Sequence, residues 1–360
     1  MRMLKATTLV LVMFLIALPL TAHAWDRGEV KRFATLPAGT SHPEGITVDR
    51  HTGEVYVADF EVTGIEGHVV VFDRKGRFLR TLRLTTATSP QPSNLLLGLD
   101  FHPTSGALLV IDFGRARVLT VDRFTGASTV FTNIPGGANA GPNALTFDKA
   151  GNVYISDSFQ GKIWRTNADG NNISAWATNP SPPDKPVLST TGVPPFGANG
   201  IAFNKHETAM FVANTGDDTV VKIPVSGSPL VAGKPVVFVN SINGADGLII
   251  DDDDNIWVCA NQADEIVIIE PTEGRVIAKL GDFNGIGRDG APIGFLFPAS
   301  LVFSGDDLLV ANLSLDLRLF GAPTVDSPWA AQVTTHTVSR IKARIPPVRG
   351  LNDNRHDDHD

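Results

Sequence analysis

One position in this chain recurs six times and carries an oxygen-bearing side chain in four of its copies. These four residues, each directly before a small residue that opens an apolar, strand-like run, are Glu44, Asn143, Asn199 and Asp246. Carboxylate and amide oxygens are the ligands that calcium takes in flexible number, and two carboxylates brought together without a cation would repel each other. We therefore expect the four residues to bind one divalent cation, with calcium as the expected ion, if the fold brings them to one point.

The four residues lie in a repeated unit that has the length of a β-propeller blade. The unit contains a small residue, an alternating apolar strand, a turn rich in Asp, Gly or Asn, and a second strand that ends in Asp or Asn. Its small residue falls at Gly45, Gly98, Ala144, Gly200, Gly247 and Ser300. The steps between these positions are 53, 46, 56, 47 and 53 residues. Each copy is followed by a third and usually a fourth strand-like run, which is typical of a propeller blade.

The two ends of the repeat array complement each other. The sixth copy has no fourth strand, while residues 29–36, just before the first copy, form a strand-like run without partners. Joining them closes a ring and removes two exposed sheet edges. We therefore predict an all-β chain in which residues 25–347 form a single six-bladed β-propeller, with four antiparallel strands per blade and the N-terminal strand completing the last blade. The first strand of each blade then lines the axis, where the four oxygen-bearing residues converge.

The termini indicate export. Residues 1–24 combine Arg2 and Lys5 with an apolar run and the small-x-small pattern Ala22-His23-Ala24, which predicts a cleaved signal peptide and a periplasmic or secreted protein. The apolar run is too short to span a bilayer comfortably, so we expect no membrane association after cleavage. Residues 348–360 are polar, and we expect them to form a disordered tail.

The net charge and the cysteine content limit the kinds of partner and of stabilisation that we expect. The net charge of −8 becomes −10 once Arg2 and Lys5 are removed, which argues against binding to nucleic acid and leaves a small molecule as the expected partner. Cys259 is the only cysteine, so the fold must rest on its core and sheet hydrogen bonds rather than on disulfides. No feature of the sequence specifies an oligomeric state.

Long connections should surround the cation site. The links 85–94, 181–197 and 283–298, and an insertion at 313–335, all open on the predicted face of the site and suggest a lid or pocket wall. Their aromatic residues, which we expect to make the pocket apolar, are Phe196, Phe295, Phe297, Phe320 and Trp329. The polar ends of the second strands are interpreted as turn caps, and three of them are also candidate substrate contacts: Asn214, Asn261 and Asn312.

The segments PEG at 43, PNA at 142, ANG at 198 and ADG at 245 resemble the metal-ligand positions of the senescence marker protein/gluconolactonase family, to which paraoxonase and diisopropyl fluorophosphatase are similar. The resemblance covers the repeats of the whole mature chain. It implies a six-bladed propeller with a central calcium or other divalent ion held by Glu44, Asn143, Asn199 and Asp246. It also implies a calcium-dependent hydrolase of lactones or related esters. The sugar lactonases carry an arginine two residues before the blade-3 asparagine, whereas Gly141 stands here, which argues against a sugar-acid lactone.

For such a hydrolysis, Asp246 or Glu44 is a candidate catalytic base toward a metal-bound water, and His42 is a second candidate that could also contact substrate. Two other interpretations stay open. One is a non-catalytic propeller of the NHL type that binds a ligand or a protein partner on the same face. The other is a strictosidine synthase-like propeller, which needs no metal.

Overall fold

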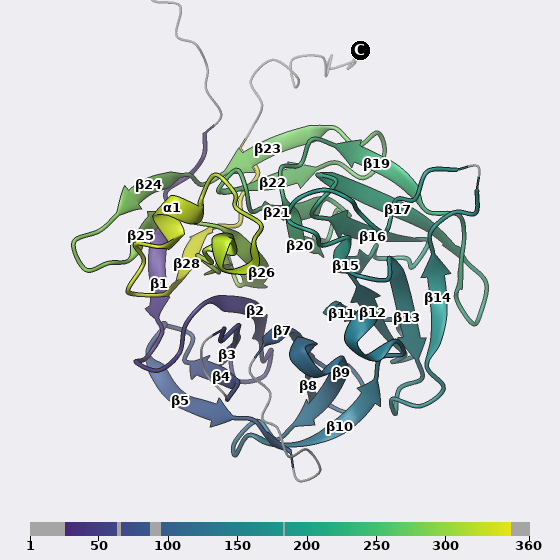
Figure 1. Ribbon diagram of the computed structural model, residues 1–360, viewed down its shortest axis with the longest axis horizontal. Coiled ribbons are helices and arrows are strands. Elements are labelled where there is room, and N and C mark those ends of the chain that lie inside the picture. The colour runs from purple at the N-terminus through teal and green to yellow at the C-terminus, as the bar shows by residue number, and fades with distance from the viewer. Residues whose placement is uncertain (1–25, 63–65, 87–94, 183, 347–360) are drawn as a thin grey trace, which may run out of the picture.

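The computed structural model describes residues 26–62, 66–86, 95–182 and 184–346, and these form a ring of six β-sheets around a central axis (Figure 1). The predicted all-β, six-bladed propeller with four antiparallel strands per blade is confirmed. The predicted signal peptide, positions 87–94 of the first long link and the predicted polar tail lie outside the described residues.

Each blade contributes one strand to the axis and three outside it. The innermost strands are β2 (Pro43–Val48), β7 (Leu96–Phe101), β11 (Pro142–Phe147), β15 (Ala198–Phe203), β20 (Ala245–Ile250) and β26 (Pro298–Ser304). The second strands are β3 (Val55–Asp59), β8 (Leu108–Asp112), β12 (Val153–Asp157), β16 (Ala209–Asn214), β21 (Ile256–Ala260) and β27 (Asp307–Asn312). The third strands are β4 (His68–Phe72), β9 (Arg117–Val121), β13 (Lys162–Thr166), β17 (Thr219–Ser226), β22 (Glu265–Ile269) and β28 (Thr337–Lys342). The outer strands are β5 (Phe78–Arg83), β10 (Ala127–Asn133), β14 (Ser174–Thr178), β19 (Val236–Asn240), β23 (Val276–Leu280) and β1 (Lys31–Thr35).

The sixth sheet contains strands from both ends of the described chain. Its order is β1-β28-β27-β26, and β1 runs antiparallel to β28 with Lys31 opposite Arg340 and Thr35 opposite Thr337. The last blade therefore has four strands like the others, and blades 1 and 6 lie side by side in the ring (Figure 1). This neighbourhood places residues of the first blade next to residues more than 250 positions later.

Burial follows the position of each strand in its blade. The second strands are buried along almost their whole length, as in β3, β8, β12 and β21, because they have a neighbouring blade on each face. The outer strands β5, β14 and β19 are mostly exposed or half-buried, with one buried residue each. The core consists of clusters of aliphatic and aromatic side chains between adjacent blades.

The small residue of the repeat is required by close contact between inner strands. A Cβ atom added to Gly45 would lie 2.2 Å from the carbonyl oxygen of Leu97, and one added to Gly200 would lie 2.4 Å from that of Asp246. A larger side chain would push neighbouring blades apart. Since this contact fixes the inner strand at its start, it also fixes the direction of the residue just before the glycine.

The ring also carries shorter strands and helical turns. β6 (Thr85–Thr86) pairs parallel with β10, β18 (Val231–Ala232) pairs with β17, and β24 (Phe283–Ile286) forms a hairpin with β25 (Pro292–Gly294). The helical turns are η1 (Phe113–Arg115), η2 (Gly137–Asn139), η3 (Leu317–Phe320) and α1 (Ser327–Ala330). The last two belong to the blade-6 insertion. No helix in the described part of the chain has the length and apolar character needed to cross a bilayer.

Candidate metal and substrate site

A cavity of about 210 Å³ lies at one end of the central axis, and all four predicted ligands line it. Glu44 comes from β2, Asn143 from β11, Asn199 from β15 and Asp246 from β20. Each is the second residue of its inner strand and is almost completely buried. The ring of blades thus brings together side chains that are up to about 200 positions apart in the sequence.

The two carboxylates of this cavity are short of partners. Glu44 is 4% exposed and Asp246 is 5% exposed, and the Glu44 Oε2 and Asp246 Oδ1 atoms have no hydrogen-bond partner in the described structure. Burial raises the pKa of Glu44 well above its ordinary value, and the charge of Asp246 raises it further. Burial also raises the pKa of Asp246. Two buried carboxylates with free oxygens, beside two amides, fit a hard divalent cation.

Two hydroxyl groups orient the amides. The Asn143 Nδ2 donates to Ser158 Oγ at 3.3 Å, and the Asn199 Nδ2 donates to Thr215 Oγ1 at 2.9 Å. Each hydroxyl in turn donates to the first carbonyl of the next inner strand at 2.7 Å, so it can only accept from the amide. The amide oxygens are therefore the atoms left to face the cavity. Ser158 and Thr215 directly follow the polar ends of β12 and β16.

Of the three asparagines predicted to contact substrate, Asn261 alone lines the cavity. Its Nδ2 donates to Asp246 Oδ2 at 2.8 Å, which holds that carboxylate and leaves Oδ1 free. Asn214 instead donates to the carbonyl of Val187 at 2.8 Å and accepts from a turn amide. Asn312 donates to Ser339 Oγ at 2.8 Å within the sixth sheet. The last two residues hold backbone in place, as the turn-cap interpretation expects.

His42 lies outside the residues that line the cavity. Its ring packs against His336 with centroids 4.6 Å apart, and its Nδ1 lies 2.9 Å from Ser41 Oγ. Burial lowers the pKa of His42, and it lowers the pKa of His336 to about 3. The pairing was not predictable from the sequence around either histidine, because it depends on the contact between blades 1 and 6.

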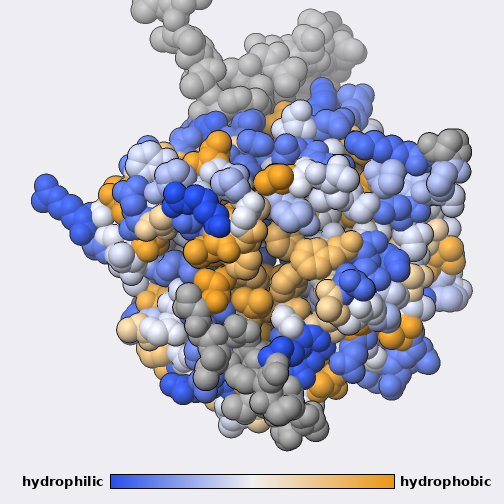
Figure 2. Space-filling view, viewed as in Figure 1, coloured by the Kyte–Doolittle hydropathy of each residue, from blue (hydrophilic) through white to orange (hydrophobic). Residues whose placement is uncertain are grey.

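The wall of the cavity is apolar. Its aromatic members are Phe60, Phe113, Phe159, Phe196, Phe297 and Phe320. Figure 2 shows hydrophobic surface gathered around the hollow at the centre of this face. Three of the five aromatics predicted for the pocket are among them, whereas Phe295 is buried in the core between blades 5 and 6, and Trp329 packs on Phe283 with centroids 5.7 Å apart.

Phe60, Phe113 and Phe159 were missed by the sequence reasoning, although a signal existed. Phe60 and Phe113 directly follow the polar ends of β3 and β8, and Phe159 comes one residue later than the corresponding position of blade 3. This position also holds Thr215 and Leu313, which line the cavity as well. In blades 1, 2, 4 and 6 the residue after the polar end of the second strand is thus a second recurring position that faces the site.

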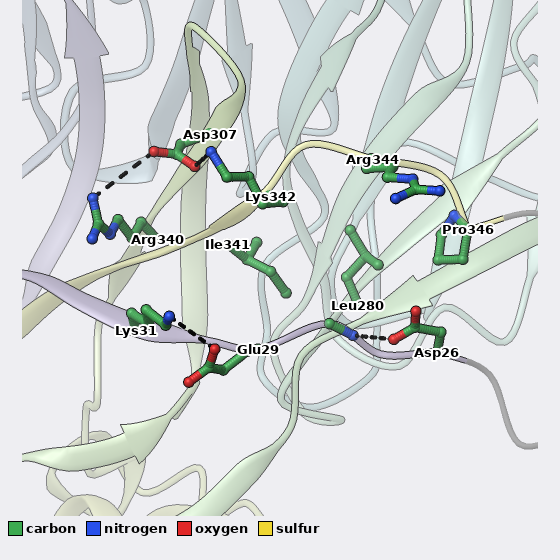
Figure 3. A pocket seen from close by; sticks show the side chains of 11 residues that line it. Asp26, Glu29, Lys31, Leu280, Asp307, Arg340, Ile341, Lys342, Arg344 and Pro346 are labelled. Carbon is green, nitrogen blue, oxygen red and sulfur yellow. Dashed lines mark hydrogen bonds and ion pairs between the residues drawn. The ribbon is translucent and has the colours of Figure 1, made fainter.

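A second cavity, of about 370 Å³, lies against β1 and β28 on the outside of the ring (Figure 3). Two of its carboxylates are paired with lysines: Glu29 with Lys31 at 2.8 Å, and Asp307 with Lys342 at 2.8 Å. These ion pairs support the last blade.

Comparison with known proteins agrees with the resemblance found in the sequence. Residues 104–281 match the family model described as SMP-30/Gluconolactonase/LRE-like region. The matched part contains three of the four predicted ligands, Asn143, Asn199 and Asp246. A search of curated proteins gives no match.

Solved structures of similar proteins confirm the fold. A luciferin-regenerating enzyme aligns with a TM-score of 0.62 and 18% identity over 88% of this chain and 95% of that chain. The calcium-binding protein regucalcin of Agrobacterium tumefaciens aligns with a TM-score of 0.58 and 17% identity over 88% of this chain and 98% of that chain. A gluconolactonase of Xanthomonas campestris aligns with a TM-score of 0.58 and 13% identity over 86% of this chain and 88% of that chain. At such identities the likeness concerns the fold alone.

Proposed function

We propose that the protein, in which residues 104–281 match the SMP-30/gluconolactonase family model, is an exported, divalent-metal-dependent hydrolase that acts on a lactone or related ester at the central cavity. The observation that carries this proposal is the pair of buried carboxylates, from blades 1 and 5, that each keep one oxygen without a hydrogen-bond partner. The names of two similar structures, a calcium-binding protein and a gluconolactonase, support the choice of ion and reaction.

The residues that would hold the cation are Glu44, Asn143, Asn199 and Asp246. A bound divalent cation, with calcium as the expected ion, supplies a Lewis acid that polarises a substrate carbonyl and stabilises the oxyanion formed during attack. Other residues of the chain would position the ligands and shield the site. Asn261 holds Asp246, the two hydroxyls fix the amides, and the apolar wall keeps bulk water from the floor.

The proton of the attacking water needs an acceptor. The candidate acceptors are the carboxylates of Glu44 and Asp246, whose pKa is raised by burial while no cation is bound. Asn261 holds Oδ2 of Asp246 and thereby orients this carboxylate, with Oδ1 left toward the proposed cation, so Asp246 is the candidate acceptor with the fixed orientation. His42 packs against His336 outside the lining, so the proposal gives it no part in proton transfer.

The test is a metal analysis of the purified protein joined to an esterase and lactonase assay. We expect one divalent ion per chain, loss of hydrolysis with a chelator, and recovery on adding calcium. Protein that hydrolyses substrates equally well after its metal has been removed would contradict the proposal. Binding of metal and ligand without turnover would favour the non-catalytic propeller instead.

Export can be tested separately. N-terminal sequencing of the protein from the periplasm or medium of an expressing cell should give a chain that begins at Trp25. A full-length chain recovered from the cytosol would contradict the export part of the proposal and leave the chemistry untouched.

A further inference from the structure

We propose that the substrate is a small, uncharged ester or lactone bearing an aromatic or alkyl group, and that Phe159 is the residue that selects it. This inference rests on the proposed hydrolysis and names the class of molecule that the same cavity accepts.

The wall contains a continuous arc of phenylalanine rings. Ring centroids lie 6.3 Å apart for Phe320 and Phe60, 6.1 Å for Phe60 and Phe113, 5.5 Å for Phe113 and Phe159, and 5.7 Å for Phe159 and Phe196. These separations are those of rings in contact. The rings come from blades 1, 2 and 3, from the link between blades 3 and 4 and from the blade-6 insertion. Separate parts of the chain thus form one apolar surface around the entrance.

The polar groups of the cavity are confined to its floor. Among the described lining residues there is no lysine, arginine or histidine, and the polar members are the four predicted ligands with Thr215 and Asn261. A sugar acid would place hydroxyls and a carboxylate against phenylalanine, where they lose water without gaining a partner. An apolar group loses nothing there. The cavity of about 210 Å³ exceeds the roughly 150 Å³ that suffices for benzene.

Phe159 and Phe320 are the two exposed rings of this wall. Phe320 is 53% exposed and Phe159 is 45% exposed although it lines the cavity, so a bound apolar group could cover the Phe159 ring. Its ring also packs on the backbone of Gly141, where a Cβ atom would lie 2.7 Å from the ring carbon Cγ. The glycine therefore sets where the ring stands, and even an alanine there would displace it.

The test compares substrates in the metal-loaded protein. We expect kcat/KM to rise from acetate to butyrate among p-nitrophenyl esters and from short to longer alkyl lactones, and to exceed that for glucono-1,5-lactone at least tenfold. Phe159→Ala should lower kcat/KM for the aryl esters about tenfold, mainly through a higher KM. Compared with Phe159→Ala, Phe159→Leu should recover more of the kcat/KM for alkyl lactones than of that for aryl esters. Gly141→Ala should change the order of preference while the metal content stays the same.

Phe124→Ala is the matched control, because Phe124 is 66% exposed and does not line the cavity. Faster hydrolysis of glucono-1,5-lactone than of any apolar substrate would overturn the inference while preserving the proposed hydrolase. Calorimetric binding of an alkyl lactone without turnover would contradict the proposed hydrolase while preserving the apolar class of ligand. Unchanged selectivity in both Phe159 variants would remove Phe159 as the selecting residue and overturn the inference.

Discussion

The two ends of the central channel are built from the same six inner strands, but the carboxylates at the two ends differ in their hydrogen-bond and ion-pair partners. At the end where the strands begin, Glu44 and Asp246 keep oxygens without a hydrogen-bond partner. The opposite mouth, a larger cavity of about 940 Å³, is lined by the later residues of the same strands, including Asp100, and by residues that follow them, including Asp49. There Asp49 pairs with Arg123 at 2.8 Å.

Asp100 makes the contrast sharper, because burial raises its pKa as it does for Glu44 and Asp246. Its Oδ1, however, accepts from Thr47 Oγ1 and from the amide of Phe101, both at 2.7 Å. A raised pKa is thus common to both ends of the channel, whereas a fully buried carboxylate oxygen without a hydrogen-bond partner distinguishes the predicted metal end.

The largest effect is expected for Glu44→Gln and Asp246→Asn. Each change removes a charge that a divalent cation would need, so we expect loss of stoichiometric metal and a fall in kcat/KM of about 10²- to 10³-fold. Metal analysis and the ester assay on the same preparation check this. Asp253→Asn, at an exposed hairpin carboxylate, is the control. Full metal content in either ligand variant would end the case for the site.

A smaller effect is expected when the groups that orient the ligands are removed. Thr215→Val and Asn261→Leu delete the hydrogen bonds to Asn199 and Asp246 without removing a ligand. Loss of such supporting contacts lowers metal affinity about 10- to 100-fold. Isothermal titration with calcium measures it. Thr215→Ser keeps the hydroxyl and should retain the affinity. Equal weakening by Ser and Val would mean that packing, rather than the hydrogen bond, holds Asn199.

The repeat, the blade boundaries and the four residues that line one cavity could be predicted from the sequence, because each depends on a pattern local to one blade. It did not reach Ser158 and Thr215 as groups that orient the amides, nor the pairing of His42 with His336. Those contacts depend on which atoms neighbouring blades bring together. The position after each second strand recurs as regularly as the ligand position. Its role was hidden because its residue types differ between blades.

The stability of the protein should depend on pH through two buried carboxylates, Asp326 and Asp264. Burial raises the pKa of Asp326, in the blade-6 insertion, to about 6. Burial, and then the charges of Asp326 and Glu265, raise the pKa of Asp264 to about 8. Both folded-state values exceed the unfolded ones, so their contribution to stability is full below about pH 4 and is lost as pH rises toward 8.

We therefore expect Asp326→Asn to flatten the fall in stability between pH 4 and 8 and to stabilise the protein on the order of 1 kcal/mol at pH 8. Thermal unfolding across this range measures the slope, with the exposed Asp253→Asn as the control. A variant that is less stable than the parent at pH 8 would show that the Asp326 carboxylate is ionised and paired, contrary to its unpartnered Oδ2.

The smallest effect is expected for Asp100→Asn, and it bears most directly on the contrast between the two mouths. Asp100 lines the other end of the channel and is half-buried, and its Oδ1 already accepts hydrogen bonds from Thr47 and Phe101. An amide oxygen can accept the same two hydrogen bonds. Metal content should therefore stay the same, and kcat/KM should change by less than about twofold, as expected for sites that do not couple. If Asp100→Asn instead depleted the metal as Glu44→Gln does, buried charge anywhere along the axis would suffice for binding, and the free oxygens at the other end would no longer explain the site.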